Sequence, residues 1–410
     1  MKKTKTLLTS IAASAVMIGM GPAAQAQSIE LEVASWKGNE AEPAGLPEII
    51  ARYEEQNPDI TVQLNYLARG EVDKVVTPRI MAGSPPSVVM ADPALMIQWS
   101  QAGALADLGA DSAFVSQMMP DVKSVMNRDG SYYVQPLELT GLGNFVNAGL
   151  LEEAGIEAPP ATLAELADAC AKLNEAGIGP MVFGGYSGRL LLTANALDGN
   201  EVEPTSYLDG TQTFAQDESF AAGLDAIRAV VDAECFDPEL MAGVNPWSTG
   251  LQAFMSEQYA MFIQGSWNIG RFAQVEGLDV VFTPIPTAEA PGAALLGLGP
   301  GWAIPEASPH PEAARKWLDF FMEPEILGLF LADEQAASPY STIESGMAAS
   351  ASAFVDALET NAINDPTKTT LWPGAFEDEI ENSVVSFLLN MEMENSELLG
   401  RWDAFLAELN

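Results

Sequence analysis

The stretch IELEVASW (29–36) begins with alternating apolar and polar residues, which predicts a β-strand. Apolar residues then recur at helical spacing until Pro58 ends that helix, and ITVQLNY (60–66) alternates again. A second helix over 72–82 leads to SVVMA (87–91), a continuous apolar run typical of a strand that is buried on both faces. Strand, helix, strand, helix, strand is the pattern of a parallel α/β layer.

The rest of the chain extends this α/β pattern over a length that suits two or three domains. The sequence has 410 residues, of which 48% are hydrophobic and 18% are charged, an ordinary globular balance. The alternation of strands and helices pauses near 132–143, resumes with a helix over 163–173, and includes a second buried-type strand at 260–263. The fold class is therefore α/β.

The N-terminus has the features of a secretory signal peptide. A basic start is followed by an apolar stretch from Leu7 to Met20 and by Ala24-Gln25-Ala26, so we expect cleavage after Ala26. The apolar stretch is too short for a permanent membrane-spanning helix, although a membrane anchor is the alternative. No cysteine stands directly after the cleavage site to carry a lipid, so we expect an unanchored protein in the periplasm.

Charge and cysteine content limit the possible partners. The formal net charge is −39, and removal of the three signal-peptide lysines gives −39 − 3 = −42. Such a chain repels nucleic acid and anionic lipid. Cys170 and Cys235 are the only cysteines, and in an exported protein they permit either a disulfide or two buried thiols. We expect both of them in the same domain.

Most kinds of enzyme site have no support in the sequence. The single histidine, His310, and two distant cysteines cannot build a zinc or copper site, and we expect no metal and no cofactor. There is no Gly-x-Ser-x-Gly motif and no phosphate-binding loop. A pair of carboxylates remains, because 57 acidic residues always supply one, so a secreted glycoside hydrolase is the enzymatic alternative.

The tryptophans give a more informative signal than the acidic residues. Trp36, Trp267 and Trp302 follow strand-like runs or glycine-rich turns, and Trp247 and Trp372 lie beside prolines. An indole face packs well on the C–H face of a sugar ring, while carboxylates and amides bind the sugar's hydroxyl groups. The alternative for each ring is core packing.

Five segments resemble the family 1 extracellular solute-binding proteins of ABC sugar importers, the group that includes maltose-binding protein. The resemblance runs from about Leu31 to the C-terminus. It rests on the order and spacing of a helix-to-strand turn, a crossover, a helix end with the next helix start, a buried strand and a glycine-rich return strand: MAGSPPSVV (81–89), YVQP (133–136) with NFVN (144–147), LEEAG (151–155) with PPATL (159–163), AMFIQGSW (260–267) and GPGWAI (299–304).

The resemblance implies a two-lobed periplasmic-binding-protein fold, similar to type II, with the ligand held between lobes that close about a hinge. Because the chain of that family crosses between lobes more than once, we expect discontinuous lobes. The first would comprise 27–137 with 296–334, and the second 138–295 with 335–410. The resemblance also implies transient docking of a monomer at membrane permease subunits, and no turnover of the ligand.

Position along the chain, matched to the family where a match exists, predicts the ligand-binding residues. Tryptophans would stack on the ligand, carboxylates would accept hydrogen bonds from hydroxyl groups, and two glycines would let backbone N–H groups approach it. The predicted set is Trp36, Glu40, Asp92, Glu138, Tyr186, Asn195, Trp247, Gly265, Trp267, Gly301, Trp302 and Trp372.

We expect the ligand to be a small, mostly neutral sugar or glycoside, of mono- to disaccharide size. The chain after residue 26 has only 18 − 3 = 15 basic residues, and an uncompensated buried charge is costly. An acidic or phosphorylated sugar, bound by one arginine, is the alternative. The basic residues that could approach the ligand are Lys37, Arg69, Arg189 and Arg271. A structural or adhesive envelope protein is a third possibility for function.

Overall fold

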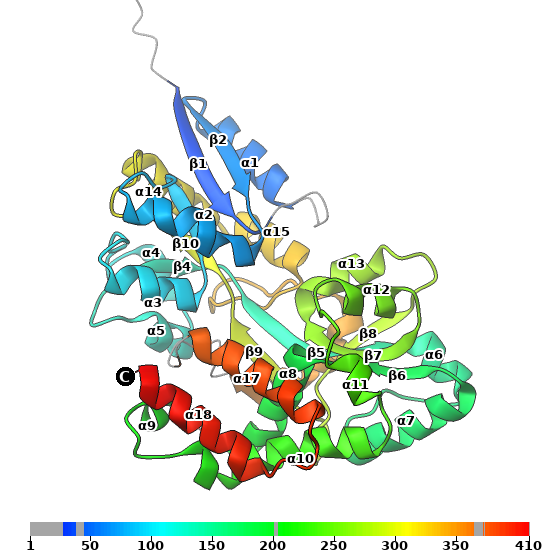
Figure 1. Ribbon diagram of the computed structural model, residues 1–410. Helices are drawn as coiled ribbons and strands as arrows, with labels where there is room; N and C mark the ends of the chain where they lie inside the picture. The colour runs from blue at the N-terminus through cyan, green and yellow to red at the C-terminus, as the bar shows by residue number, and fades with distance from the viewer. Residues whose placement is uncertain (1–27, 38–44, 201–203, 365–371, 373, 410) are drawn as a thin grey trace, which may run out of the picture.

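A computed structural model describes residues 28–37, 45–200, 204–364, 372 and 374–409. The chain forms two lobes, each built around its own β-sheet (Figure 1). The predicted signal peptide and Glu40 lie outside the described residues. None of the described helices is long and apolar enough to cross a membrane.

The sheet of the first lobe has the order β2-β1-β3-β10-β4. Its parallel part is the strand–helix–strand layer that the N-terminal sequence predicts, while β10 returns antiparallel to β3 and β4. The strands are β1 (Ile29–Ser35), β2 (Ile60–Tyr66), β3 (Val88–Ala91), β4 (Val134–Pro136) and β10 (Gly301–Ala303).

Amphipathic helices cover this sheet. In α1, Leu46, Ile49 and Tyr53 are buried, and the Tyr53 ring packs edge-on against Trp317 of α14 at 5.1 Å. The helices of this lobe are α1 (Gly45–Gln56), α2 (Arg69–Met81), α3 (Pro93–Gln101), α4 (Ala113–Gln117), α5 (Pro120–Met126), α14 (Pro311–Phe321) and α15 (Pro324–Glu334). Pro58, which was predicted to end the first helix, follows its observed end at Gln56, and the helix predicted over 72–82 is observed over Arg69–Met81.

The sheet of the second lobe has the order β11-β9-β5-β7-β6, with β8 also paired to β5. Its long central strand β5 is buried along its whole length, with Leu142 and Val146 in the core on one face and Phe145 in the core on the other. The strands are β5 (Leu139–Asn147), β6 (Gly179–Val182), β7 (Tyr259–Gly265), β8 (Val280–Thr283), β9 (Ala294–Leu298) and β11 (Ala362–Asn364).

Helices pack on both faces of this second sheet, in agreement with two separate hydrophobic cores around it. The helices are α6 (Ala148–Glu153), α7 (Leu163–Ala176), α8 (Gly185–Leu197), α9 (Pro204–Leu208), η1 (Phe214–Gln216), α10 (Glu218–Asp232), α11 (Pro238–Met241), α12 (Thr249–Met255), η2 (Ser266–Asn268), α13 (Ile269–Ala273), η3 (Ala349–Ala351), α16 (Ser352–Leu358), α17 (Gly374–Leu388) and α18 (Asn395–Leu409).

The chain crosses between the lobes at several places. Crossings lie between β4 and β5, between β9 and β10, and after α15, so each lobe contains separate pieces of sequence. The first core continues past Glu334 to include Ala336, Ala337, Tyr340 and Ile343. The expected lobe limits stay a proposal. This packing favours a last crossing that lies beyond Ile343 rather than at residue 334.

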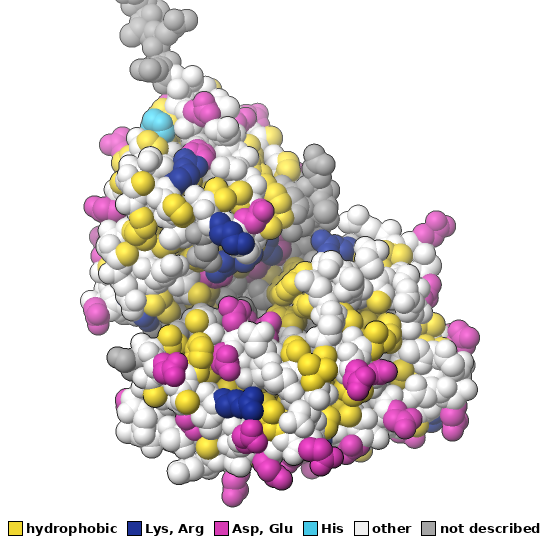
Figure 2. Space-filling view, viewed as in Figure 1, with side chains coloured by type: hydrophobic (Ala, Val, Ile, Leu, Met, Phe, Trp, Pro, Cys, Tyr) yellow, Lys and Arg dark blue, Asp and Glu magenta, His cyan; other side chains and the backbone are white. Residues whose placement is uncertain are grey.

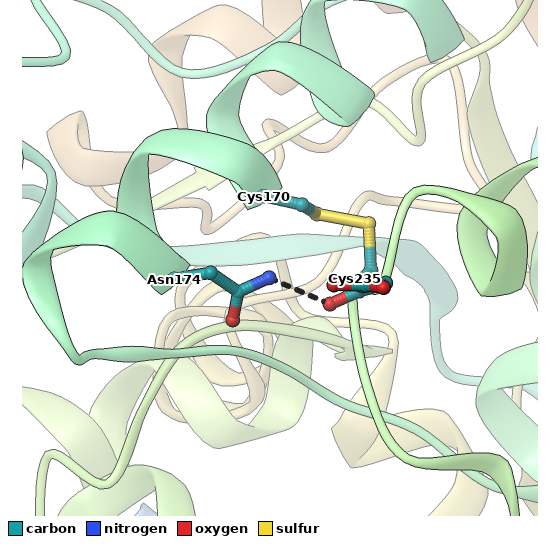
Figure 3. The surroundings of a disulfide bond; sticks show 4 residues. Cys170, Asn174 and Cys235 are labelled. Carbon is teal, nitrogen blue, oxygen red and sulfur yellow. Dashed lines mark hydrogen bonds between the residues drawn. A yellow bond between two sulfur atoms is a disulfide. The ribbon is translucent and has the colours of Figure 1, made fainter.

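A disulfide joins Cys170 to Cys235 within the second lobe (Figure 3). Cys170 lies on α7 and Cys235 follows α10, so the bond ties the two segments together across a sequence separation of 65 between the cysteines. Asn174, one turn further along α7, donates a hydrogen bond to the carbonyl oxygen of Glu234 at 2.9 Å. Of the two states that the sequence left open, the structure contains the disulfide, and the expectation that both cysteines share a lobe is confirmed.

Candidate functional site

Three side chains meet at the carboxyl edge of the first sheet. Trp36 follows β1 and Asp92 follows β3, and these two strands are parallel neighbours, so their ends lie on the same edge. Arg69, the first residue of α2, donates from Nε to Asp92 Oδ2 at 2.6 Å and places its guanidinium 5.4 Å from the centre of the Trp36 ring. The two predicted site residues are therefore linked through an arginine.

Asp92 has a second role that fixes its orientation. It is the N-cap of α3, and its Oδ1 accepts a hydrogen bond from the Leu95 N–H at 2.9 Å. Capping satisfies one of the free N–H groups of the first helical turn. The carboxylate is thus held on one side by a helix end and on the other by Arg69, with about a quarter of the side chain exposed.

A second cluster of charges lies where the chain crosses from β4 to β5. Lys37, just after Trp36, forms ion pairs with Glu334 at the end of α15 and, at 3.6 Å, with Glu138. Thr140 donates to Glu138 Oε1 at 3.3 Å. All three charged side chains are at most one-tenth exposed, and Glu138 is only 2% exposed.

Burial changes the acidity of Glu138. Desolvation penalises the charged carboxylate and, with the nearby negative charge of Glu334, raises the pKa of Glu138 to about 7 against the opposing attraction of Lys37. Its Oε2 atom is buried without a hydrogen-bond partner among the described residues. Glu138 is therefore not an exposed hydrogen-bond acceptor of the kind that we expected, but part of a buried ionic cluster.

An aromatic group in the second lobe brings three predicted residues together. The rings of Trp247 and Trp267 are stacked with centroids 5.9 Å apart, and the Tyr186 ring lies 4.9 Å from that of Trp247. Trp247, in the turn before α12, is 51% exposed, whereas Trp267, in η2, is partly buried. Behind Tyr186 lies Arg189, which is fully buried and paired with Glu377 and Glu381.

Neighbouring protein atoms leave no room for a side chain at the two glycines that we predicted to bind the ligand. A Cβ on Gly265 would lie 2.1 Å from the indole of Trp267, so this glycine leaves room for that ring, and its N–H donates to Gln264 Oε1. A Cβ on Gly301 would lie 2.2 Å from the carbonyl oxygen of Gln135, because β10 runs between β3 and β4. These contacts require glycine at both positions without a ligand, and the expected role of presenting N–H groups to a ligand stays a prediction.

Three further predicted residues belong to the packing of the lobes. Trp302 is 0% exposed and contacts Trp317 and Phe321 in the first core, so its ring is not available for stacking. Trp372 is 3% exposed among the aromatic rings of the second core. The Asn195 amide donates to the carbonyl oxygens of Leu191 and Pro286. Sequence could not separate these residues from ligand-binding residues, because no local pattern shows whether a tryptophan or an asparagine is buried in the packed fold.

Other residues that complete the two clusters were not predicted from the sequence. Glu334 and Thr140 were not selected, and Lys37 and Arg69 were named only as basic residues near a ligand. Glu334 comes from a helix end some 297 residues from Lys37, so no local pattern connects them. Arg69 lies between the strand predicted at 60–66 and the helix predicted over 72–82, and this position after a strand was the available signal.

Space-filling atoms show a hollow between the two lobes (Figure 2). Dark blue basic side chains and magenta acidic side chains gather on the part of the first lobe that faces the second. The 3₁₀ turn η2, which carries Trp267, packs against α15, whose last residue is Glu334. Within the described segments no group of histidine, cysteine, aspartate and glutamate residues is arranged to hold a metal ion.

Comparison with known proteins identifies a family-level match. A family model described as bacterial extracellular solute-binding protein matches residues 37–326. Among curated proteins, none matches the sequence significantly. Similar solved structures cover almost the whole chain, although sequence identity is low enough that they show the fold alone.

Three of these structures have carbohydrate ligands in their descriptions. The GacH receptor of Streptomyces glaucescens, studied unliganded and with acarbose, is 20% identical over 93% of this chain and 98% of its own, with a TM-score of 0.77. A chitin oligosaccharide binding protein is 20% identical over 93% and 99%, with a TM-score of 0.75. A Bacillus licheniformis sugar transporter in complex with stachyose is 18% identical over 93% and 100%, with a TM-score of 0.68.

Proposed function

Because the chain belongs to the bacterial extracellular solute-binding protein family, we propose that it captures a carbohydrate between its two lobes and delivers it to an ABC importer. The observation that carries this proposal is the stacked pair of Trp247, which is half exposed, and Trp267, which lies on the η2 turn that packs against the first lobe's helix α15. Apolar ring faces with a few fixed polar groups are what sugar rings require. The descriptions of the similar structures, which name sugars, support it.

The ligand that fits this site best is a neutral sugar or glycoside of mono- to disaccharide size. Three cations near the predicted site residues are each matched by carboxylates: Lys37 by two, Arg69 by Asp92, and Arg189 by two. An anionic ligand would have to compete with these carboxylates, at the energetic cost of leaving them buried and unpaired. In this proposal, Asp92 and Trp36 bind the neutral sugar from the first lobe.

We propose a binding protein without turnover rather than a glycoside hydrolase. Glu138 and Glu334 form the closest candidate for a carboxylate pair, but both are held by Lys37 and buried. In a glycoside hydrolase the general acid and the nucleophile must contact the scissile bond. Carboxylates that are buried and paired with a lysine are poorly placed to make that contact. The proposal includes export through residues 1–26, an unlipidated monomer in the periplasm, and transient docking to permease subunits.

A thermal-shift screen over neutral sugars, polyols and acidic sugars tests the proposal. A ligand present at about 100 times its dissociation constant should stabilise the protein by about 2.7 kcal/mol. A hit should bind with one-to-one stoichiometry in calorimetry and should be recovered unchanged by chromatography. Product formation would favour the hydrolase instead. Binding of acidic but not neutral sugars, lost in Arg271→Ala, would contradict the neutral ligand.

A further inference from the structure

The buried cluster of Lys37, Glu138 and Glu334 contains more negative than positive charge. One ammonium group faces two carboxylates, and each side chain is at most one-tenth exposed. The three residues come from the end of β1, the crossing from β4 to β5, and the end of α15. A net charge that is removed from water is strongly disfavoured unless it is neutralised.

We propose that this cluster is a proton-binding site, and that closure of the two lobes takes up a proton at Glu138. The inference rests on the proposed function only because it assumes that the lobes close. Protonation leaves one ammonium and one carboxylate, Lys37 and Glu334, which form a neutral pair. Glu138 Oε2, which has no hydrogen-bond partner among the described residues, then no longer carries an unsatisfied charge.

Both lobes contribute to the burial of the cluster. Thr140, which donates to Glu138, belongs to β5 of the second sheet, and η2 of the second lobe packs against α15, which ends in Glu334. Separation of the lobes would admit water and return the acidity of Glu138 toward that of a hydrated glutamate, whose pKa is about 4.3. The closed form therefore binds the proton more tightly. By linkage, a proton favours the closed form equally.

The neighbouring ionisable groups favour Glu138 as the residue that titrates. The main cause of its raised pKa is burial, and Glu334 adds to it while Lys37 opposes it. Asp333 lies next to Glu334, and burial also raises its pKa. The hydroxyl group of Tyr340 donates to the Pro136 carbonyl oxygen at 2.6 Å, and burial keeps the pKa of this tyrosine well above its usual value, so it stays neutral.

Carbon-detected NMR of the ligand-free protein with labelled glutamate carboxyl groups tests the proton site. The midpoint of one resonance should lie above those of the other glutamates, between about 4.3 and about 7 according to the fraction of closed protein, and Glu138→Gln should remove this resonance. Glu334→Gln should lower that midpoint, because it removes a repelling charge. If every glutamate carboxyl group in the wild type titrates as hydrated carboxylates do, at about pH 4.3, the proton site is excluded.

Small-angle X-ray scattering of the same ligand-free protein tests the link to closure. The radius of gyration should fall as the pH is lowered through the midpoint that NMR gives, and Glu138→Gln should abolish this dependence. Glu48→Gln, which removes an exposed ion-pair partner of Arg52 on α1, is the matched control and should keep the wild-type response. A titrating Glu138 with a pH-independent radius would overturn the coupling.

Neither measurement uses a carbohydrate, so their outcome is independent of the sugar screen. If the screen finds no carbohydrate ligand, the proton site and its link to closure can still be measured. Conversely, if Glu138 does not titrate near neutral pH, the proposed carbohydrate-binding function is untouched. The failure of one proposal is thus distinguishable from the failure of the other.

Discussion

The indole of Trp247 stacks on the indole of Trp267, with ring centroids 5.9 Å apart and planes inclined by 26°. The two rings come from different segments, the turn before α12 and the 3₁₀ turn after β7. Trp247 is half exposed and forms the outer part of the pair, while the Trp267 ring lies over Gly265. The space above Gly265 thus fixes the inner ring, and the outer ring is free to face solvent or a ligand.

We expect Trp267→Ala to weaken carbohydrate binding by at least about 30-fold, because truncation of a central aromatic contact costs about 2 kcal/mol or more. Trp247→Ala should have a smaller effect, since its ring is already half exposed. Calorimetric titration with the sugar found in the screen measures both. Trp402→Phe, in the buried core of the second lobe, is the control and should leave affinity unchanged. Unaltered affinity in Trp267→Ala would remove the main support for stacking.

Trp302→Ala should act on stability rather than on affinity. Its side chain is buried against Trp317 and Phe321, and removal of a buried tryptophan costs about 3–5 kcal/mol. Denaturant unfolding measures the loss. The fraction that remains folded at low temperature should bind the sugar as the wild type does. A loss of affinity without a loss of stability would instead show that Trp302 contributes to ligand binding.

Arg69→Met should weaken ligand binding with little effect on folding. The arginine orients Asp92 and contacts the Trp36 ring, but it is about one-third exposed, and such ion pairs contribute at most about 1 kcal/mol to stability. Comparison of calorimetric affinity with the unfolding midpoint separates the two effects. Arg79→Met, which removes another partly exposed ion pair of α2, is the matched control. Equal affinities in both variants would show that Arg69 does not position the site.

Replacement of both Cys170 and Cys235 by alanine should destabilise the protein by about 4 kcal/mol. The disulfide closes a segment of 65 residues, and the chain-entropy estimate for a loop of that length is of this size. The wild type should lose a similar amount of stability in reductant, whereas the double variant should not respond to it. If native wild-type protein reacts with a thiol label at both positions without reductant, the bond is absent.

Glu138→Gln should change how stability depends on pH. Because the pKa of Glu138 is raised to about 7 in the folded protein, its stabilising effect is complete below the unfolded value near 4.5 and is lost as the pH rises through 7. The wild type should therefore lose up to about 1.4 kcal/mol per pH unit relative to the variant within this window. Denaturant unfolding of both proteins at several pH values measures the difference. Parallel stability curves would contradict the raised pKa.

The sequence by itself determined the α/β class and the place of most elements. The N-terminal strands have period-two or continuous apolar patterns, and Pro93 and Pro311 stand at the start of helices, where proline is favoured. These features are local, because backbone geometry ties each pattern to one kind of element. The segments from 81–89 to 299–304 likewise indicated the family, whose model matches residues 37–326.

Only the tertiary structure decided which of the predicted residues lie together. Trp267 follows a strand-like run and Trp302 follows a glycine-rich turn, yet the first ring stacks on an exposed neighbour and the second is buried beneath α14. The ion pair of Lys37 with Glu334 joins residues 297 positions apart, and its burial depends on where the chain crosses between lobes. Burial and charge pairing are properties of the packed fold, because they depend on contacts between segments that no local sequence pattern records.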